Sequence, residues 1–353
     1  MTSNLRIILI HLTMFLDVLG NWMFNIYLFN QLNGLDEKIT YIAVLFTCIR
    51  LSNFFSLFAG GKFLNSPKTY FLITIMIRIG VLIFAFYLLD PVNQMENIRI
   101  VLIVIFIKNI FSGNDKAIYT QMINEYIDNR EFHYKIREYI CSLSLIVCYP
   151  AFQFSIQINY KSPILFDIIS FIFLFALVLR SDFILQLMQK TFFIKLKDLK
   201  LALASVHESK EILFHSFVLI LSHTIVFNYS YEYFLSLKNV GDVSFLYTLI
   251  GLSFLIGNIL SKYIKFLIDY RFVVLMNFII YYFSINSNQS SMIIVLLFFV
   301  ANIAMSFNSY KLNVKYFSIL PKEHSVVLTN INTFILLSAS IFGAWLLVLL
   351  RTF

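Results

Sequence analysis

The sequence predicts an all-α polytopic membrane protein with about eleven transmembrane helices. Of its 353 residues, 59% are hydrophobic and only 13% are charged. Soluble domains carry about 25% charged residues, so this chain has too little charge to cover a water-facing surface. Glycine and proline are few, and the apolar runs reach the roughly 20 residues that a helix needs to cross a bilayer. Lipid is therefore the expected surrounding of most of the chain.

Eleven apolar segments of membrane-crossing length follow one another along the chain. They lie near residues 5–30, 40–61, 69–89, 98–122, 137–158, 162–180, 213–236, 243–262, 266–284, 291–314 and 325–350. The N-terminus runs directly into the first segment without a small-x-small cleavage site. We therefore expect a retained first helix rather than a removed signal peptide.

Lysine and arginine residues assign the two sides of the membrane. With the N-terminus placed inside, the inner segments hold seventeen of these residues, the outer segments hold five, and five lie within spans. Cytoplasmic loops carry such an excess. The distribution predicts a cytoplasmic N-terminus in a multi-pass plasma-membrane protein, and the Phe, Ile, Asn and Lys usage suggests a bacterium. It also accounts for the net charge of +8 without a nucleic-acid partner.

The stretch at 181–212 alternates apolar residues with lysines at helical spacing. This pattern is typical of a basic amphipathic helix that lies on the inner leaflet, and a partner-binding helix is the alternative. The stretch divides the chain into an N-terminal six-helix bundle at 1–180 and a C-terminal five-helix bundle at 213–353. Parallel six-helix repeats are a known transporter architecture.

No motif in the sequence indicates an enzyme. The chain lacks a GxxxxGK[ST] loop for ATP, and the HExxH and GxSxG patterns are also absent. Its three cysteines, Cys48, Cys141 and Cys148, lie in apolar runs without metal-ligand spacing. They are predicted to be small buried residues, and neither a metal nor a cofactor is expected.

Several local patterns carry a family resemblance. The first span contains LDVLGNWMFNIYLFNQLNG, the second is followed by GGKFLNSPK, the fourth ends in FSGNDKAIYTQMINEYI, and the sixth opens with LFDIISF. Together with the central basic segment, they resemble the major facilitator superfamily, in particular its macrolide-efflux-like drug:proton antiporter branch. The resemblance implies a two-bundle helical fold and a secondary transporter, expected to be monomeric, that exports a small amphipathic compound in exchange for protons.

Two departures from that family pattern support an alternative function. The loop signature after the second span keeps Gly60 or Gly61 and the basic Lys68, but its acid and its arginines are absent. The family usually has twelve helices, and the sequence ends at Phe353, where a twelfth helix would begin. The alternative is a transport-inactive relative that acts in immunity, sensing or assembly.

Charges within the predicted spans are the first candidate site residues, because a charge at mid-bilayer costs about 2.5–3.5 kcal/mol on insertion scales. Asp17, Arg50, Arg78 and Lys108 each lie about half-way along one of the first four spans. Asp17 is either a proton-coupling carboxylate or the partner of Arg50 or Lys108 in a structural ion pair. Arg50 and Arg78 suit structural pairing, with Arg50 also a cavity candidate. Lys108 is the candidate for a cavity cation that favours an anionic substrate group.

The remaining candidates lie near helix ends or in the second half of the chain. His223 is at mid-depth in span seven and is either a hydrogen-bonded core residue or a coupling site. Glu232, among tyrosines, is expected in an interfacial aromatic belt, with an outer gate as the alternative. Asp167, near the outer end of span six, is expected to accept hydrogen bonds from backbone amides. Asp115 and Lys116 are expected at the wetted inner rim.

Overall fold

The structure is a computed structural model that describes residues 3–31, 38–59, 67–89, 94–110, 130–180, 207–236, 240–264, 270–286, 291–319 and 325–352. The described residues form eleven α-helices: α1 (Ser3–Gln31), α2 (Lys38–Ala59), α3 (Pro67–Leu88), α4 (Gln94–Ile110), α6 (Arg130–Ile158), α7 (Ser162–Arg180), α10 (His207–Ser236), α11 (Val240–Tyr263), α12 (Tyr270–Asn286), α13 (Ser291–Ile319) and α14 (Ser325–Thr352). The predicted all-α fold is confirmed, and every predicted span overlaps one of these helices.

Several helix boundaries differ from the sequence prediction; helix α6, for example, begins at Arg130, whereas the fifth span was expected to begin at 137. Helix α10 begins at His207, whereas the seventh span was expected to begin at 213, so the end of the proposed linker belongs to this helix. Residues 181–206, which make up the rest of that linker, lie outside the described residues. Residues 111–129 also lie outside them, so the predicted end of the fourth span near 122 stays a prediction.

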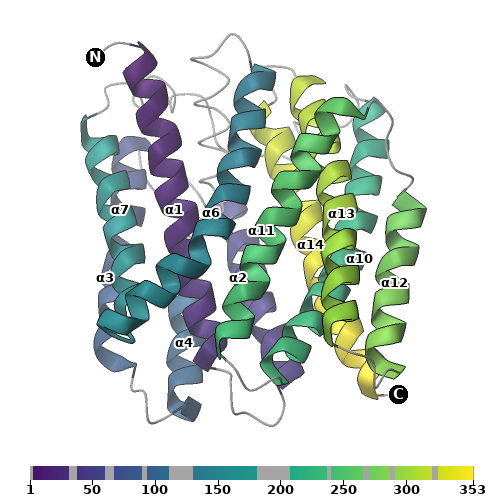
Figure 1. The fold of residues 1–353 in the computed structure, drawn as a ribbon. Helices are drawn as coiled ribbons and strands as arrows, with labels where there is room; N and C mark the ends of the chain where they lie inside the picture. The colour runs from purple at the N-terminus through teal and green to yellow at the C-terminus, as the bar shows by residue number, and fades with distance from the viewer. Residues whose placement is uncertain are drawn as a thin grey trace.

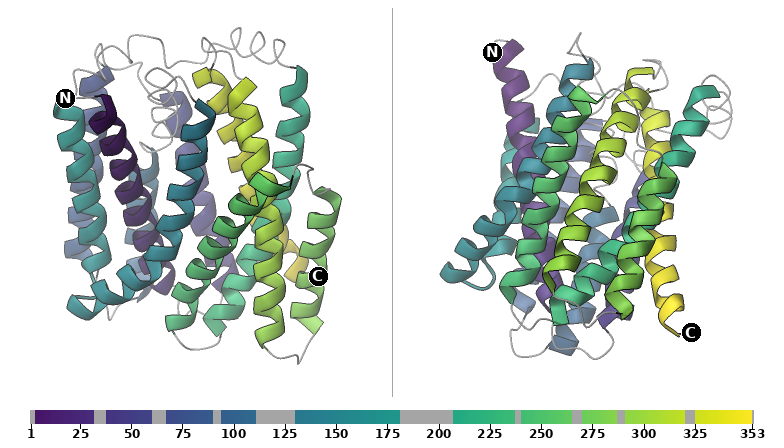
Figure 2. Two further views of the ribbon diagram at one scale, coloured as in Figure 1. Left: turned by 45° about the horizontal axis from the view of Figure 1, so that its top comes forward. Right: turned by 45° about the vertical axis from the view of Figure 1, so that its right-hand side comes forward.

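The helices stand side by side and alternate in direction, so that the N-terminus lies at the upper end of the bundle in Figure 1 and the C-terminus at the lower end. Two further views show the helices lying alongside one another in the same way (Figure 2). Five helices contain segments that are long and apolar enough to cross a membrane by length and composition. These segments are Ile8–Leu28, Lys135–Ile158, Ser162–Leu179, Val295–Tyr316 and Asn332–Leu349.

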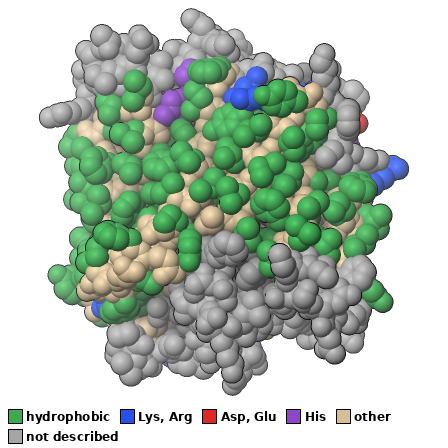
Figure 3. Space-filling model, viewed as in Figure 1, with side chains coloured by type: hydrophobic (Ala, Val, Ile, Leu, Met, Phe, Trp, Pro, Cys, Tyr) green, Lys and Arg blue, Asp and Glu red, His purple; other side chains and the backbone are tan. Residues whose placement is uncertain are grey.

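The outer surface of the bundle is apolar. Figure 3 shows hydrophobic side chains over most of the described part of one face, with only a few basic or histidine side chains among them. Large apolar side chains such as Tyr87, Phe154, Phe173 and Phe342 are more than half exposed. In water this exposure would be costly, but the same surface suits contact with lipid chains.

The turn between α6 and α7 shows how a very short polar join can separate two membrane helices. The carbonyl of Asn159 accepts a hydrogen bond from the Ser162 amide at 2.8 Å, and the Asn159 side-chain oxygen accepts one from the Lys161 amide at 2.9 Å. The Lys161 Nζ then donates to the Phe86 carbonyl at the end of α3 at 2.7 Å. These bonds satisfy polar groups that a helix end would otherwise leave open.

Contacts between the two halves of the chain repeat with a shift of six helices. Counted along the described helices, α2 is the second and packs on the eleventh, α14, while α6 is the fifth and packs on the eighth, α11. Adding or subtracting six converts one pair into the other. The same operation converts the contact of α1 with α11 into that of α10 with α2. The contact pattern of the described helices thus repeats with this shift, as expected for parallel repeats.

Candidate functional site

Apart from Arg137, which pairs with the neighbouring Glu138 of α6 at 2.9 Å, four charged side chains are buried in the N-terminal half of the described chain. They are Asp17 on α1, Arg78 on α3, Lys108 on α4 and Asp167 on α7, and each is at most 8% exposed. Two are acids and two are bases, so the formal charges balance. Balance matters because an uncompensated charge in an apolar interior costs several kcal/mol. We call these four residues the charge cluster.

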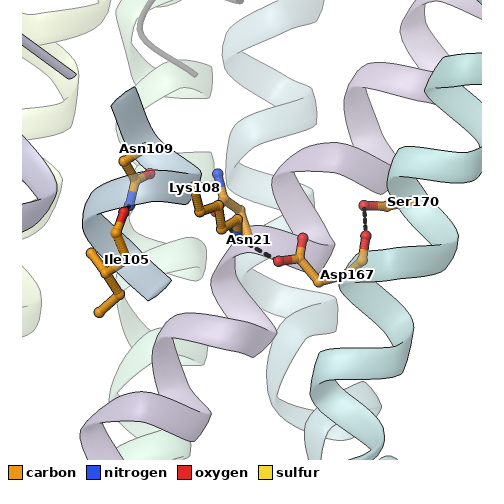
Figure 4. Close-up of polar contacts among 6 residues, drawn as sticks. All are labelled: Asn21, Ile105, Lys108, Asn109, Asp167 and Ser170. Atoms are coloured by element: carbon orange, nitrogen blue, oxygen red, sulfur yellow. Dashed lines mark hydrogen bonds and ion pairs between the residues drawn. The ribbon is translucent and has the colours of Figure 1, made fainter. Parts of the chain in front are cut away.

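The centre of the charge cluster is an ion pair between α4 and α7. The Lys108 Nζ donates to the Asp167 Oδ2, and the two side chains are 1% and 0% exposed. The same Nζ donates to the Asn21 side-chain oxygen on α1 at 2.9 Å (Figure 4). It also lies 4.3 Å from the centre of the Phe24 ring, within cation–π range. Three helices are thus joined at one ammonium group.

Arg78 and Asp17 complete the charge cluster. Both act electrostatically on Lys108, and Arg78 also acts on Asp167. The Arg78 guanidinium lies 5.3 Å from the centre of the Phe171 ring. Because opposite charges are interleaved on four helices, the charge cluster holds the N-terminal bundle in a single register while leaving its net charge at zero.

A close approach of α1 and α7 brings the charge cluster together. A Cβ atom added at Gly20 would lie 2.9 Å from the Ser170 hydroxyl and 3.1 Å from the Asp167 Cα, so any other residue there would push the helices apart. Small residues allow such close helix contacts in membranes. The Ser170 hydroxyl donates to the Asp167 carbonyl at 2.7 Å, as Figure 4 shows. The second carboxylate oxygen of Asp167 accepts no hydrogen bond from the described part of the chain.

Two expectations from the sequence are corrected by these contacts. Asp167 was expected to accept from backbone amides, but its described partner is the Lys108 ammonium. Lys108 was the candidate for an uncompensated cavity cation, but it is compensated by Asp167 and lies near Asp17 as well. The reason is the relative height of the helices: in Figure 1 the lower end of α4 lies below that of α7. Counting residues from each helix's own end misses this offset.

Of the other sequence candidates, the structure describes the side chains of two, and both lie outside the charge cluster. Arg50 is half-buried on α2, and His223 is half-buried on α10 with its ring centre 6.5 Å from that of Phe254 on α11. Of Lys68 on α3 and Glu232 on α10 the structure describes the helix but not the side chain. The remaining candidates lie outside the described residues: Gly60, Gly61, Asp115 and Lys116.

A polar contact between the two bundles was missed by sequence reasoning. On α11, the buried Asn258 Nδ2 donates to the Ser142 hydroxyl of α6 at 3.1 Å. The Asn258 side-chain oxygen accepts from the Ser306 hydroxyl of α13 at 3.2 Å. Nearby, a Cβ added at Gly251 would lie 2.7 Å from the Ile146 amide nitrogen of α6. An asparagine and serines within apolar spans were the available signal, because buried amides seek partners on other helices.

Further contacts join the bundles in their lower halves. The Trp345 indole of α14 donates to the Thr47 hydroxyl of α2 at 2.9 Å. The Trp22 ring of α1 lies 5.4 Å from the Tyr247 ring of α11. Because α11 and α6 meet through Asn258 in their upper halves, the described bundles touch both above and below the middle of the interface.

Comparison with known proteins places the fold. No family model matches the sequence, and no curated protein matches it. The structure is nevertheless similar to the human organic anion transporter TETRAN, with a TM-score of 0.64 and 12% identity over 99% of this chain and 93% of that one. The MFS proton:xylose symporter XylE gives a TM-score of 0.67 and 13% identity over 99% and 90%. The chain has the major facilitator fold.

A third similar structure has the same fold. A bacterial homologue of the iron transporter ferroportin, in an outward-facing state, gives a TM-score of 0.67 and 12% identity over 98% of this chain and 92% of that one. These proteins carry different substrates on the major facilitator fold. At such low identity the fold is shared, whereas substrate and coupling must be argued from the residues of this chain.

Proposed function

We propose that the protein is a secondary active transporter that moves a small molecule by alternating access between its two bundles. The observation that supports this most strongly is the six-helix repeat of the bundle contacts, in which α2 packs on α14 as α11 packs on α6. Alternating access in such folds is largely a rocking of one bundle against the other, and these contacts lie where the two bundles meet. In this proposal 1–180 and 213–353 are the moving units and 181–212 links them.

We further propose that protons drive the cycle and that Asp17 is the group that binds them. In the charge cluster, Lys108 lies between two carboxylates, with Asp167 bound directly and Asp17 close enough to act on it electrostatically. Protonation of Asp17 would raise the net charge of the charge cluster from zero to one. A change of one charge at this depth is large enough to bias a conformational equilibrium. Asp17 is also less completely buried than Asp167.

The direction, substrate class and location belong to the same proposal. Export of an amphipathic compound follows from the resemblance to the macrolide-efflux-like branch. The excess of lysine and arginine on the side of the N-terminus supports a cytoplasmic N-terminus in a bacterial plasma membrane. The protein is proposed to act as a monomer, with lipid, protons and the transported compound as its partners.

Everted membrane vesicles test the proposal. Vesicles with the protein should take up at least one compound from a panel of anionic, neutral and cationic amphipathic dyes faster when a proton gradient is imposed than after it is collapsed with an uncoupler. Vesicles from the same strain without the protein provide the control. A protein that is inserted at normal levels but moves none of a broad compound panel, with or without a gradient, would support the transport-inactive alternative.

A further inference from the structure

Arg50 is a membrane-embedded cation that lies outside the charge cluster. Arg50 of α2 is half-buried, and its Nε atom has no hydrogen-bond partner in the described structure. Among the described residues Arg50 takes part in no ion pair, whereas Lys108 and Asp167 of the charge cluster pair with each other. A guanidinium within a membrane helix is costly unless an anion or water meets it.

Arg50 lies on the face of α2 that is turned toward the other bundle. Helix geometry places Ala43, Thr47 and Arg50 on one face, since they are four and three residues apart. Thr47 accepts a hydrogen bond from Trp345 of α14, which fixes the direction of this face. The opposite face carries the buried Leu45 and Ser52, and Leu45 belongs to the hydrophobic core of the described chain. Arg50 thus belongs to the interface between the bundles.

Within their described residues, the helices around this face offer Arg50 no acid at mid-height. Helix α2 packs on α4, α10 and α14, and neither α2 nor α14 contains an aspartate or a glutamate in its sequence. The acids of α4 and α10 all lie near helix ends: Glu96, Glu208, Glu211 and Glu232. Arg50, in contrast, lies about half-way along α2. Its natural counter-charge is therefore a group that these helices do not contain.

We propose that Arg50 binds the anionic group of the transported compound. The inference rests on the proposed transport function, because it gives the substrate class at the interface where the compound would cross. A guanidinium presents two parallel N–H donors that match a carboxylate or a sulfonate, and Trp345 on the facing helix offers an aromatic surface to an apolar body. The chemical class is a small amphipathic organic anion.

Binding to matched compounds tests this assignment without any gradient. The purified protein in nanodiscs of neutral phosphatidylcholine is dialysed against labelled 4-tert-butylbenzoate, its neutral amide, or the cationic 4-tert-butylbenzylammonium, with empty nanodiscs subtracted. A charge-assisted hydrogen bond is worth about 1.5–3 kcal/mol, so the benzoate should bind roughly tenfold or more tightly than the amide. Equal binding of benzoate and amide to the wild-type protein would overturn the inference.

Substitutions attribute the preference to one residue. Arg50→Gln should remove the preference for benzoate while binding of the amide stays unchanged, and Arg50→Lys should keep part of it. The control is Arg99→Gln. Arg99 is exposed near the lower end of α4, so this substitution removes one positive charge and leaves the interface between the bundles unaltered. A preference that survives in Arg50→Gln, or one that is lost equally in Arg99→Gln, overturns the assignment.

A measurement on the wild-type protein covers the case in which Arg50→Gln does not fold. Bound benzoate should slow the modification of Arg50 by phenylglyoxal, read by peptide mass spectrometry, whereas the amide should not. An unchanged rate overturns the inference.

Further outcomes distinguish a failure of this inference from a failure of the proposed transport function. Gradient-driven transport that is unaffected by Arg50→Gln rejects this site and keeps transport, whereas Arg50-dependent anion binding in a protein that moves nothing keeps the site and rejects transport.

Discussion

Lys108 of α4 and Asp167 of α7 form an ion pair from which the described structure excludes almost all solvent. In such a place, removal of one partner leaves a buried charge without compensation, which typically costs about 3–5 kcal/mol. We therefore expect Asp167→Asn to lower the thermal unfolding temperature of the detergent-purified protein strongly. The double variant Lys108→Met/Asp167→Asn should recover much of the loss, because no unpaired ammonium remains. Equal stability of Asp167→Asn and the wild type would contradict this account.

The contact between Gly20 and Asp167 gives a second stability prediction. Gly20→Ala adds a Cβ that would lie 2.9 Å from the Ser170 hydroxyl and 3.1 Å from the Asp167 Cα, so α1 and α7 must move apart. Such overpacking should lower the free energy of unfolding by about 1–3 kcal/mol. Gly80→Ala is the matched control. A Cβ added at Gly80 has nothing within 4 Å, and alanine favours a helix over glycine by about 1 kcal/mol. Thermal unfolding should therefore separate the two variants in opposite directions.

Asn258 should couple the two bundles. Asn258→Ala removes the bridge from α11 to Ser142 of α6 and to Ser306 of α13, at a cost of about 1–3 kcal/mol for the buried bonds. Backbone amides of α6 and α11 should then exchange hydrogen faster, read by mass spectrometry. Asn302→Ala is the control, since Asn302 donates to the Phe298 carbonyl within its own helix. Identical exchange patterns in the two variants would remove Asn258 as a bridge.

The sequence alone was sufficient to predict the architecture, because a helix must be apolar over a fixed length to cross the bilayer. Apolar length located each of the eleven helices, and the short join at Asn159 was visible as a polar interruption. The site was only partly accessible in this way. The cost of an intramembrane charge pointed to Asp17 and Lys108, but pairing depends on how high each helix sits, and Asp167 was therefore assigned the wrong partners. The position of a helix along the membrane normal depends on how it packs against its neighbours, and the sequence of a single span does not encode it.

Neutral polar residues show the other limit of sequence reasoning. Asn21 lies one turn beyond Asp17 on the same face of α1, and this i, i+4 spacing was a usable signal that the Lys108 site includes it. Asn258 had no comparable signal, since its partners come from α6 and α13, far away in the sequence. Such pairings become evident only when the bundles are assembled, because an amide in a membrane can bond to any neighbouring helix.

The orientation of the chain is open to a direct labelling test. In a variant whose native cysteines are replaced, Ser205→Cys should be protected from an impermeant maleimide in intact cells and should react once the membrane is opened. The reason is the concentration of lysines in this segment on the side of the N-terminus. Asn93→Cys, between α3 and α4 at the other end, should label from outside. Ready labelling at position 205 in intact cells would reverse the assigned orientation.

Asp17 is predicted to carry the coupling proton, and Asp17→Asn should separate coupling from folding. The variant mimics a permanently protonated carboxyl, so the charge cluster keeps a net charge of one and can no longer alternate. Protein yield should survive, because Lys108 retains Asp167 and Asn21 as partners. Gradient-driven uptake into everted vesicles should be lost, whereas exchange of labelled for unlabelled compound, which needs no net proton movement, should remain.

The outcomes of that experiment discriminate between two roles for Asp17. If Asp17 serves only as a structural counter-charge, Asp17→Asn should instead lower yield and unfolding temperature, as Asp167→Asn does, because a buried cation loses part of its compensation. Full gradient-driven transport by a well-expressed Asp17→Asn variant would remove Asp17 from the mechanism altogether. His223 would then be the next residue to test, since it is a half-buried titratable group near the middle of α10, the helix that the six-helix repeat matches with α1.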